Sequence, residues 1–211
     1  NVSFRYPKTN RYILKNLNFE IKSDIKTAII GQSGLGKTTI MKLLINMYYP
    51  ESGTITIDGI DIKNIPVNNL RSNIIYVNQK TGLFNDTVIN NIKYGNNASN
   101  EEIISYIRKY KFDTVYAGLT NGIYDIAGVN GGNLSLGMQK ITLLLRGILK
   151  NSKVIIFDEP LSGLDANTRK KVIKLINDIS SNKTIIIITH DVEILPNMDV
   201  VIDLNKLVLK H

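Results

Sequence analysis

The sequence predicts an α/β fold with a mainly parallel sheet, an N-terminal antiparallel β subdomain and an inserted α-helical subdomain. Two observations carry this prediction. In the last third of the chain, the apolar segments "KVIIFD", "TIIIIT" and "DVVIDL" alternate with helical segments such as "NTRKKVIKLINDIS". Strands that are apolar throughout indicate a parallel sheet covered on both faces. From about Thr87 to Leu149, by contrast, the spacing of apolar residues is mostly helical.

The first third of the chain predicts β structure followed by one helix. The segments "NVSFRY" and "YILKNLNFEI" alternate apolar and polar residues, with a turn between Pro7 and Arg11. A short strand, "KTAII", runs into a glycine loop, and "TTIMKLLINMY" then has helical spacing. Next, "GTITIDGIDI" contains the turn pair Asp58-Gly59, and "NIIYVNQ" is a further strand.

Two helices are expected in the insert, "NEEIISYIRKY" and "QKITLLLRGILK". A shorter helix is expected in the last third of the chain, near "VEIL". Ser99 or Asn100, placed before two glutamates, is a helix start signal. We therefore expect a single domain over 1–211, with an α/β core at about 1–79 and 150–211 and a helical subdomain at about 80–149.

The composition limits the classes of function. Of the 211 residues, 43% are hydrophobic and 21% charged, as in a soluble globular protein. The net charge of +8 suggests anionic partners, but the lysines are dispersed, so no nucleic-acid partner is expected. The chain has no cysteine, and His190 and His211 alone cannot build a His-based zinc site. No apolar run approaches the ~20 residues of a membrane span, and no signal peptide opens the chain, which we expect to be part of a longer protein.

The segment "GQSGLGKT", Gly31 to Thr38, fits the P-loop pattern, between a strand and a helix. Its glycines allow successive backbone N–H groups to face a phosphate, and the helix N-terminus adds its positive dipole end. Lys37 is expected to reach the β- and γ-phosphates and the Thr38 hydroxyl to bind Mg²⁺. The predicted core is therefore that of a P-loop NTPase, with a nucleotide site made of Gly31, Gln32, Ser33, Gly34, Leu35, Gly36, Lys37, Thr38 and Thr39.

A carboxylate pair follows the strand "VIIFD". Asp158 would lie at the carboxyl edge of the sheet, where such folds bind ligands, and would hold Mg²⁺ directly or through water. Glu159 is then placed to orient or deprotonate an attacking water. The simpler alternative is an acidic pair that caps the turn at Pro160.

Together, the P-loop, the Asp-Glu pair and "SGLD" resemble the nucleotide-binding domain of an ATP-binding cassette (ABC) transporter, from Val2 to about Leu204. The resemblance implies ATP and Mg²⁺ as ligands and an ATPase coupled to transport. The segment "LFNDTVINNIKYG" is similar to the corresponding segment of exporter-type cassettes.

The same resemblance implies further site residues. Tyr6 in "VSFRYP" would stack on adenine, with Tyr12 as the alternative and a core tyrosine as the simpler interpretation. Gln79 would bind Mg²⁺, sense water and link to the membrane domain, unless it is an ordinary loop glutamine. Asp165 belongs to the "SGLD" loop that crosses the dimer interface. His190 matches the histidine that contacts the γ-phosphate, although Asp191 stands where exporters usually have arginine.

Family cassettes form head-to-tail dimers in which each ATP lies between one P-loop and the partner's signature loop, usually L-S-G-G-Q. Here that loop is "LSLGM", which keeps Ser135 and Gly137. Leu136 would crowd the backbone's approach to phosphate, and Met138 cannot form the hydrogen bonds of glutamine. Val129 stands where exporters have a glutamate. The helix after the loop can begin at Ser135 and bury Ile141, Leu144, Leu145 and Ile148.

Only the residues that this chain would give to a partner's ATP are altered. This pattern resembles asymmetric heterodimeric exporters, in which one half has an intact catalytic glutamate and an altered signature loop and the other half has the reverse. We therefore expect a second nucleotide-binding domain as partner. It could be identical to this one, but the asymmetry favours a non-identical domain. We also expect a transmembrane domain as partner and a location at the cytoplasmic face of a membrane. The alternatives are a soluble ABC-type ATPase and a nucleotide-gated interaction module with little turnover; Glu159 argues against the second.

Overall fold

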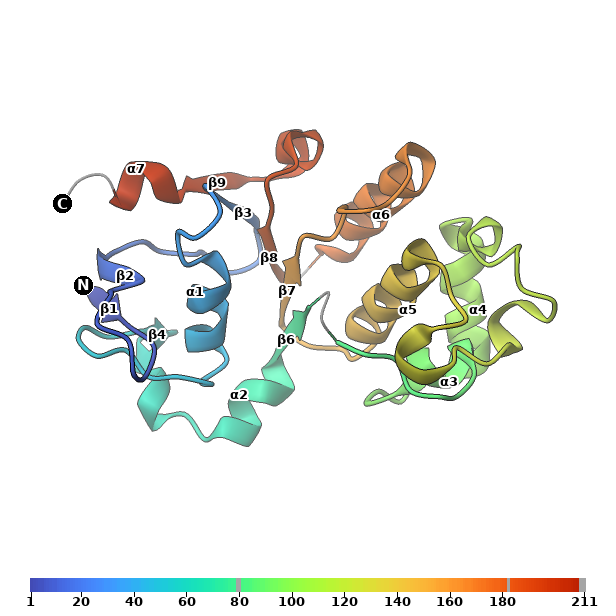
Figure 1. Ribbon diagram of the computed structural model, residues 1–211, viewed down its shortest axis with the longest axis horizontal. Coiled ribbons are helices and arrows are strands. Elements are labelled where there is room, and N and C mark those ends of the chain that lie inside the picture. The colour runs from blue at the N-terminus through green and yellow to red at the C-terminus, as the bar shows by residue number, and fades with distance from the viewer. Residues whose placement is uncertain (79–80, 182, 209–211) are drawn as a thin grey trace.

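A five-stranded parallel sheet runs through the middle of the computed structural model, which describes residues 1–78, 81–181 and 183–208 (Figure 1). Its strand order is β6-β7-β8-β3-β9, and each neighbouring pair is parallel. The strands are β3 (Lys26–Ile30), β6 (Ile74–Val77), β7 (Val154–Asp158), β8 (Thr184–Ile188) and β9 (Val200–Asp203). The predicted α/β fold with a mainly parallel sheet is confirmed.

Strands β7 and β8 are apolar on both faces because each face meets a different hydrophobic core. Ile155 and Phe157 of β7 point into the core shared with the helical insert, whereas Ile156 points into the core below the P-loop helix. Residues of β8 alternate between the two cores in the same way. Successive residues of each strand point alternately into one core and then into the other, so neither strand has a polar face.

The N-terminal β layer consists of two small antiparallel sheets. Strand β1 (Val2–Phe4) pairs with β2 (Leu14–Leu17), and β4 (Thr56–Ile57) pairs with β5 (Ile60–Asp61). The predicted turn pair closes the second hairpin, with φ of 50° at Asp58 and 79° at Gly59, as a tight two-residue turn requires. The strand predicted over residues 12–21 is shorter than expected, because β1 offers only three residues for pairing.

The helix after the P-loop, α1 (Lys37–Leu44), stops earlier than predicted. The pattern predicted a helix to Tyr48, but Asn46 adopts a left-handed φ of 56° and ends the helix. A second short helix, α2 (Val67–Asn73), precedes β6 and was not predicted. Leu70 is its one buried side chain, so it shows no helical periodicity. The short 3-10 helix η1 (Ile62–Asn64) precedes α2.

Helices α3 (Val88–Lys93), α4 (Asn100–Lys109) and α5 (Leu136–Ile148) gather on one side of the sheet (Figure 1). Helices α4 and α5 correspond to the two predicted helices of the insert, whereas α3 was not predicted as a separate helix. The side chains of Thr87, Ser99 and Ser135 cap them, each accepting a backbone N–H. Three 3-10 turns connect them: η2 (Phe112–Thr114), η3 (Gly122–Tyr124) and η4 (Val129–Gly131).

The last elements are α6 (Ala166–Ile179), the 3-10 helix η5 (Val192–Asn197) and α7 (Leu204–Val208). The helix expected near "VEIL" is thus a 3-10 helix; Pro196 lies inside it and has no N–H for an α-helical hydrogen bond. Helix α7 was not predicted. In the described part of the chain, no helix has both the length and the apolar character needed to cross a membrane.

Candidate functional site

Three predicted site segments follow strands that end at the same edge of the sheet. Ile188, the last residue of β8, pairs with Ile29 of β3 on one side and with Asp158 of β7 on the other. The P-loop begins just after β3, Glu159 directly follows β7, and His190 lies two residues after β8. Parallel register therefore brings the P-loop, the carboxylate pair and the histidine to one edge, where open α/β sheets bind ligands.

The P-loop curls back on itself between β3 and α1. Gly34 and Gly36 have φ of 87° and 84°, a backbone conformation that favours glycine. At Gly36 a Cβ would also lie 2.6 Å from Leu14 Cδ2, so the space is tight at that position as well. The Lys37 ammonium donates to the carbonyl oxygens of Gly31 at 2.6 Å and Gln32 at 2.9 Å. Its positive charge is thus held directly over the loop.

The other predicted loop residues differ in exposure. Gln32, Ser33, Gly34 and Thr38 are exposed, and Gly31, Leu35, Gly36 and Lys37 are half-buried. Thr39 is buried instead, and its hydroxyl forms a 3.0 Å hydrogen bond with the hydroxyl of Tyr6. Thr39 therefore connects the loop's helix to Tyr6 and does not face solvent.

Tyr6 is half-buried beside α1. Its ring makes edge contacts with Phe4 and Tyr48, at centroid distances of 5.1 and 5.3 Å, and the Lys42 ammonium lies 5.3 Å from its centre. Tyr12 is more exposed, and its hydroxyl donates to Glu51 at 3.2 Å. Tyr6 thus has contacts of a core tyrosine while lying next to the P-loop helix, and its adenine contact stays a prediction.

Asp158 ends β7 and accepts a hydrogen bond at Oδ2 from the hydroxyl of Tyr76, at 2.5 Å. Burial, and then this bond to the carboxylate, raise the pKa of Tyr76, so its hydroxyl remains a donor. The carboxylate of Asp158 and the exposed hydroxyl of Thr38 are hard oxygen ligands on segments that meet at one edge, and this donor set fits Mg²⁺. No local pattern pointed to Tyr76, because its partner lies 82 residues away.

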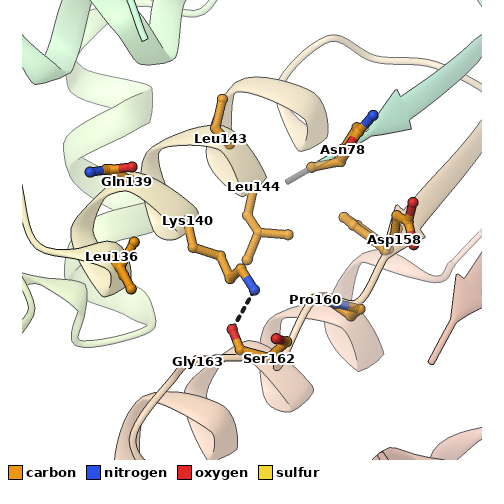
Figure 2. Close-up of a pocket in the computed structure, with 12 residues that line it drawn as sticks. Asn78, Leu136, Gln139, Lys140, Leu143, Leu144, Asp158, Pro160, Ser162 and Gly163 are labelled. Carbon is orange, nitrogen blue, oxygen red and sulfur yellow. Dashed lines mark hydrogen bonds between the residues drawn. The ribbon is translucent and has the colours of Figure 1, made fainter. Parts of the chain in front are cut away.

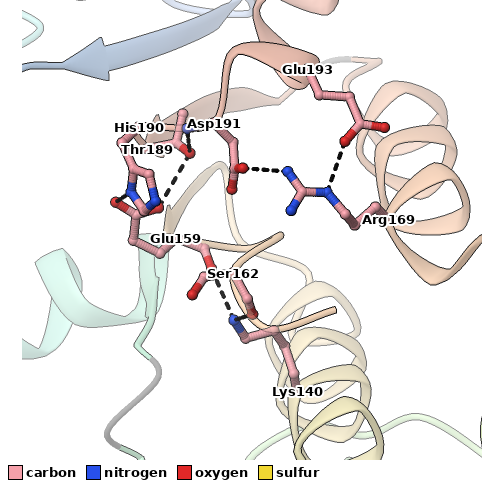
Figure 3. A network of polar contacts seen from close by, with 8 residues as sticks. All are labelled: Lys140, Glu159, Ser162, Arg169, Thr189, His190, Asp191 and Glu193. Carbon is pink, nitrogen blue, oxygen red and sulfur yellow. Dashed lines mark hydrogen bonds and ion pairs between the residues drawn. The ribbon is translucent and has the colours of Figure 1, made fainter. Parts of the chain in front are cut away.

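Glu159 and His190 are brought together, as Figure 3 shows. His190 Nδ1 lies 2.8 Å from Glu159 Oε1, and the Thr189 hydroxyl donates to Glu159 Oε2 at 3.3 Å. Glu159 adopts φ of 52°, which is rare for a residue with a side chain. Such outliers persist where surrounding contacts fix them, and here the Glu159 N–H also donates to the Ile188 carbonyl at 2.8 Å.

The residue after the histidine, Asp191, forms an ion pair with Arg169 of α6 (Figure 3). Arg169 also pairs with Glu193 at 2.8 Å, and these two hydrogen bonds raise its pKa. Asp191, which stands where the resemblance predicts an arginine, is thus paired with an arginine from α6. Glu159, His190 and Asp191 have oxygen or nitrogen atoms within 4.8 Å of one another, but the hydrogen bond between Glu159 and His190 and the ion pair of Asp191 with Arg169 already account for that cluster.

The altered signature loop leads directly into α5. Ser135 caps the helix by accepting the Met138 N–H at 3.2 Å, as predicted, and Gly137 lies in its first turn. The predicted buried face is confirmed: Ile141, Leu144, Leu145 and Ile148 are all buried. Leu136 is 72% exposed, and Met138 packs partly against the core. The side chain that replaces a glycine therefore projects outward from the loop.

Lys140, on the same helix, points toward the turn after β7 (Figure 2). It lines a cavity of about 170 Å³ together with Leu136, Asp158 and Ser162. Ligand pockets commonly measure about 300–1,000 Å³, so this cavity is too small for a drug-sized ligand.

Asp165 begins α6 as its N-cap. It accepts the N–H groups of Asn167 and Thr168, both at 3.0 Å, and the Thr168 hydroxyl at 2.6 Å. These bonds, foremost that from Thr168, lower the pKa of Asp165. Gln79, the remaining predicted site residue, lies outside the described residues.

Comparison with known proteins agrees with this geometry. Residues 14–162 match the family model described as ABC transporter. The ATP-dependent lipid A-core flippase of Methylobacillus flagellatus is 37% identical over 94% of this chain and 34% of the flippase. The iron-sulfur clusters transporter ATM1 of Saccharomyces cerevisiae is 39% identical over 98% of this chain and 30% of the transporter.

The fold also matches a solved structure. A bacterial Atm1-family ABC exporter with ATP bound superposes with a TM-score of 0.89 at 34% identity, over 97% of this chain and 36% of that one. The chain thus spans about a third of the length of the relatives it matches.

Proposed function

The chain belongs to the ABC transporter family, and from that membership we propose that it binds ATP with Mg²⁺, hydrolyses the ATP and powers export across a membrane. Residues 1–211 form one ATP-binding domain in this proposal, with the core at about 1–79 and 150–211 and the helical subdomain at about 80–149. The observation that carries the proposal is the meeting of the P-loop, the Asp158-Glu159 pair and His190 at one edge of the sheet.

ATP would bind with its phosphates in the loop from Gly31 to Thr39. The Lys37 ammonium, which donates to two carbonyls of the same loop, would contact the β- and γ-phosphates. Tyr6 would contact the adenine. Thr38 and Asp158, with Gln79 by family resemblance, would hold Mg²⁺, which when bound neutralises charge on the phosphates.

Hydrolysis would depend on Glu159. Its carboxylate would accept a proton from a water whose oxygen bonds to the γ-phosphorus, while the bond from that phosphorus to the bridging oxygen breaks and ADP leaves. His190 and Thr189 hold the two carboxylate oxygens of Glu159, at 2.8 and 3.3 Å. Because the carboxylate is held from two sides, it is oriented before the substrate arrives.

Two such domains would enclose ATP head-to-tail. Ser135, Gly137 and the Asp165 loop would face the partner domain. Leu136, 72% exposed at the start of α5, would project toward the partner's ATP where a glycine normally allows close approach. We therefore propose that this chain pairs with a non-identical domain, and that the ATP in this chain's own P-loop is the one hydrolysed.

A transmembrane domain would be the second partner and would place this chain at the cytoplasmic face of a membrane. Two exposed aromatic side chains of the helical insert, Phe84 and Tyr94, lie 4.3 Å apart, and the Arg146 guanidinium lies within 5.6 Å of both rings. We propose this small surface as the contact. Relatives named for lipid A-core and for iron-sulfur clusters match at similar identity, so we assign no cargo.

The test combines ATP turnover with isolation of partners. Lys37→Ala should abolish hydrolysis and weaken ATP binding, whereas Lys63→Ala, at an exposed lysine outside the P-loop, should leave both unchanged. The complete protein should fractionate with membranes, through its own membrane-spanning segments or through those of a bound partner. Wild-type hydrolysis in the Lys37→Ala variant, or a complete protein found apart from any membrane-spanning segment, would contradict the proposal.

A further inference from the structure

Lys140 joins the signature helix to the segment that carries the proposed catalytic carboxylate. It lies on α5, four residues after Leu136, and its ammonium donates to the backbone carbonyl oxygens of Glu159, at 3.1 Å, and Ser162 (Figure 3). Figure 2 shows the bond to Ser162. Both carbonyls belong to the turn after β7. One lysine side chain thus connects the helical insert to the core.

Lys140 contacts the backbone of an unusual turn. Glu159 adopts φ of 52°, Pro160 has no N–H to donate, and the Ser162 N–H donates to the Glu159 carbonyl at 3.3 Å. The Lys140 ammonium adds charge-assisted hydrogen bonds to two carbonyls of this turn. Removing the ammonium would therefore loosen the turn at the residue whose carboxylate must be oriented.

The ammonium is half-buried, which is costly for a lysine. Burial lowers the pKa of Lys140, while the negative charges of Glu159 and Asp191 act in the opposite direction. Its position beside these carboxylates offsets part of the cost of burial and also places positive charge next to Glu159. A lysine needed only to cover the surface of α5 would extend into solvent.

We propose that Lys140 is a positioning residue for Glu159, and that it couples the signature loop, which faces the partner's ATP, to hydrolysis at this chain's own ATP. The proposal rests on the hydrolytic function proposed above. Ser162 is also the first residue of the "SGLD" loop, so movement of α5 is transmitted to both Glu159 and the dimer-facing loop. Lys140 touches no substrate in this role.

The decisive experiment is a double-mutant cycle on the complete assembled protein. Lys140→Met removes the ammonium but keeps most of the side-chain volume, and Lys174→Met, at an exposed position on α6, is the matched control. Lys140→Met should lower kcat about tenfold or more and leave KM for ATP within about twofold, because it disturbs orientation and not ATP binding. Lys140→Arg, which keeps a charged donor, should recover most of the lost rate.

The cycle separates positioning from a general structural role. In a Glu159→Gln background, Lys140→Met should cause no further loss of the residual rate, since it acts through that carboxylate. Equal losses in both backgrounds, or a wild-type kcat in Lys140→Met alone, would overturn the proposal. If thermal unfolding shows that Lys140→Met is not folded at the assay temperature, Lys140→Gln replaces it. The same fall in kcat with a nearly unchanged KM is then expected, and the same results would overturn the proposal.

One further comparison keeps the two proposals distinct. If wild type and Glu159→Gln hydrolyse ATP at the same rate, the proposed function itself fails. If Glu159→Gln is inactive while Lys140→Met matches wild type, the coupling role of Lys140 fails and the proposed function stands.

Discussion

The Tyr76 hydroxyl donates a 2.5 Å hydrogen bond to Oδ2 of Asp158, across neighbouring strands of the sheet. This bond orients the carboxylate that we propose as a Mg²⁺ ligand. Residues that form hydrogen bonds to a metal ligand fix the rotamer of that ligand and so affect the affinity for the metal. In this proposal Tyr76 supports the Mg²⁺ site, although it belongs to none of the motifs that identify the site.

Tyr76→Phe removes this donor and little volume. Because partners of metal ligands commonly contribute about 10- to 100-fold to metal affinity, the Mg²⁺ concentration that half-saturates nucleotide binding should rise about tenfold. Tyr124→Phe, at an exposed tyrosine, is the control and should not change it. Titration of ATP binding with Mg²⁺ checks this, and identical curves for wild type and Tyr76→Phe would refute the role.

Arg169→Met should destabilise the domain by about 2 kcal/mol, because it leaves the mostly buried carboxylate of Asp191 without its cation. Lys170→Met changes an exposed neighbour on α6 and should alter the free energy of unfolding by less than about 0.5 kcal/mol. Urea denaturation measures both. The ion pair would be unimportant for stability if the two variants unfolded at the same midpoint.

Asp165 gives a pH-dependent prediction. Hydrogen bonds to its ionised form lower its pKa in the folded state, so its contribution is present above the unfolded pKa and is lost as pH falls through the folded pKa. Asp165→Ala should cost about 1 kcal/mol at pH 7, as loss of a helix N-cap does. The difference in unfolding free energy between wild type and variant should shrink on acidification below about pH 4. A difference that stays constant from pH 7 to pH 3 would contradict this assignment.

The signature loop offers a gain-of-function test. Replacing Leu136 by Gly and Met138 by Gln restores the family's usual loop. In the assembled dimer this double variant should raise hydrolysis at the partner's site, provided that the partner has a catalytic carboxylate, and leave this chain's own ATP affinity unchanged. Labelled nucleotide trapped in each P-loop distinguishes the two sites. Loss of ATP binding at this chain's own P-loop would count against the assignment of the loop to the partner.

The sequence predicted those features that depend on neighbouring residues. The glycine positions of the P-loop, the Asp58-Gly59 turn, the Ser135 cap and the apolar strands are local patterns, and the structure has them. What the sequence did not predict are contacts between distant segments: Tyr76 with Asp158, Lys140 with Ser162, and Arg169 with Asp191. Each depends on strand order and helix packing, which no local pattern encodes. The early end of α1 at Leu44 is a similar case, because the apolar pattern continues while Asn46 turns the backbone.

The central claim is that Glu159, held by His190, carries ATP hydrolysis at the edge of the sheet where the P-loop meets β7. The direct measurement is the steady-state ATPase rate of the assembled protein with Glu159→Gln, which keeps the size of the side chain but removes its basicity. Because general bases contribute about 10²- to 10⁴-fold, kcat should fall at least about 100-fold while ATP affinity is retained. A variant that hydrolyses ATP at the wild-type rate would contradict the account.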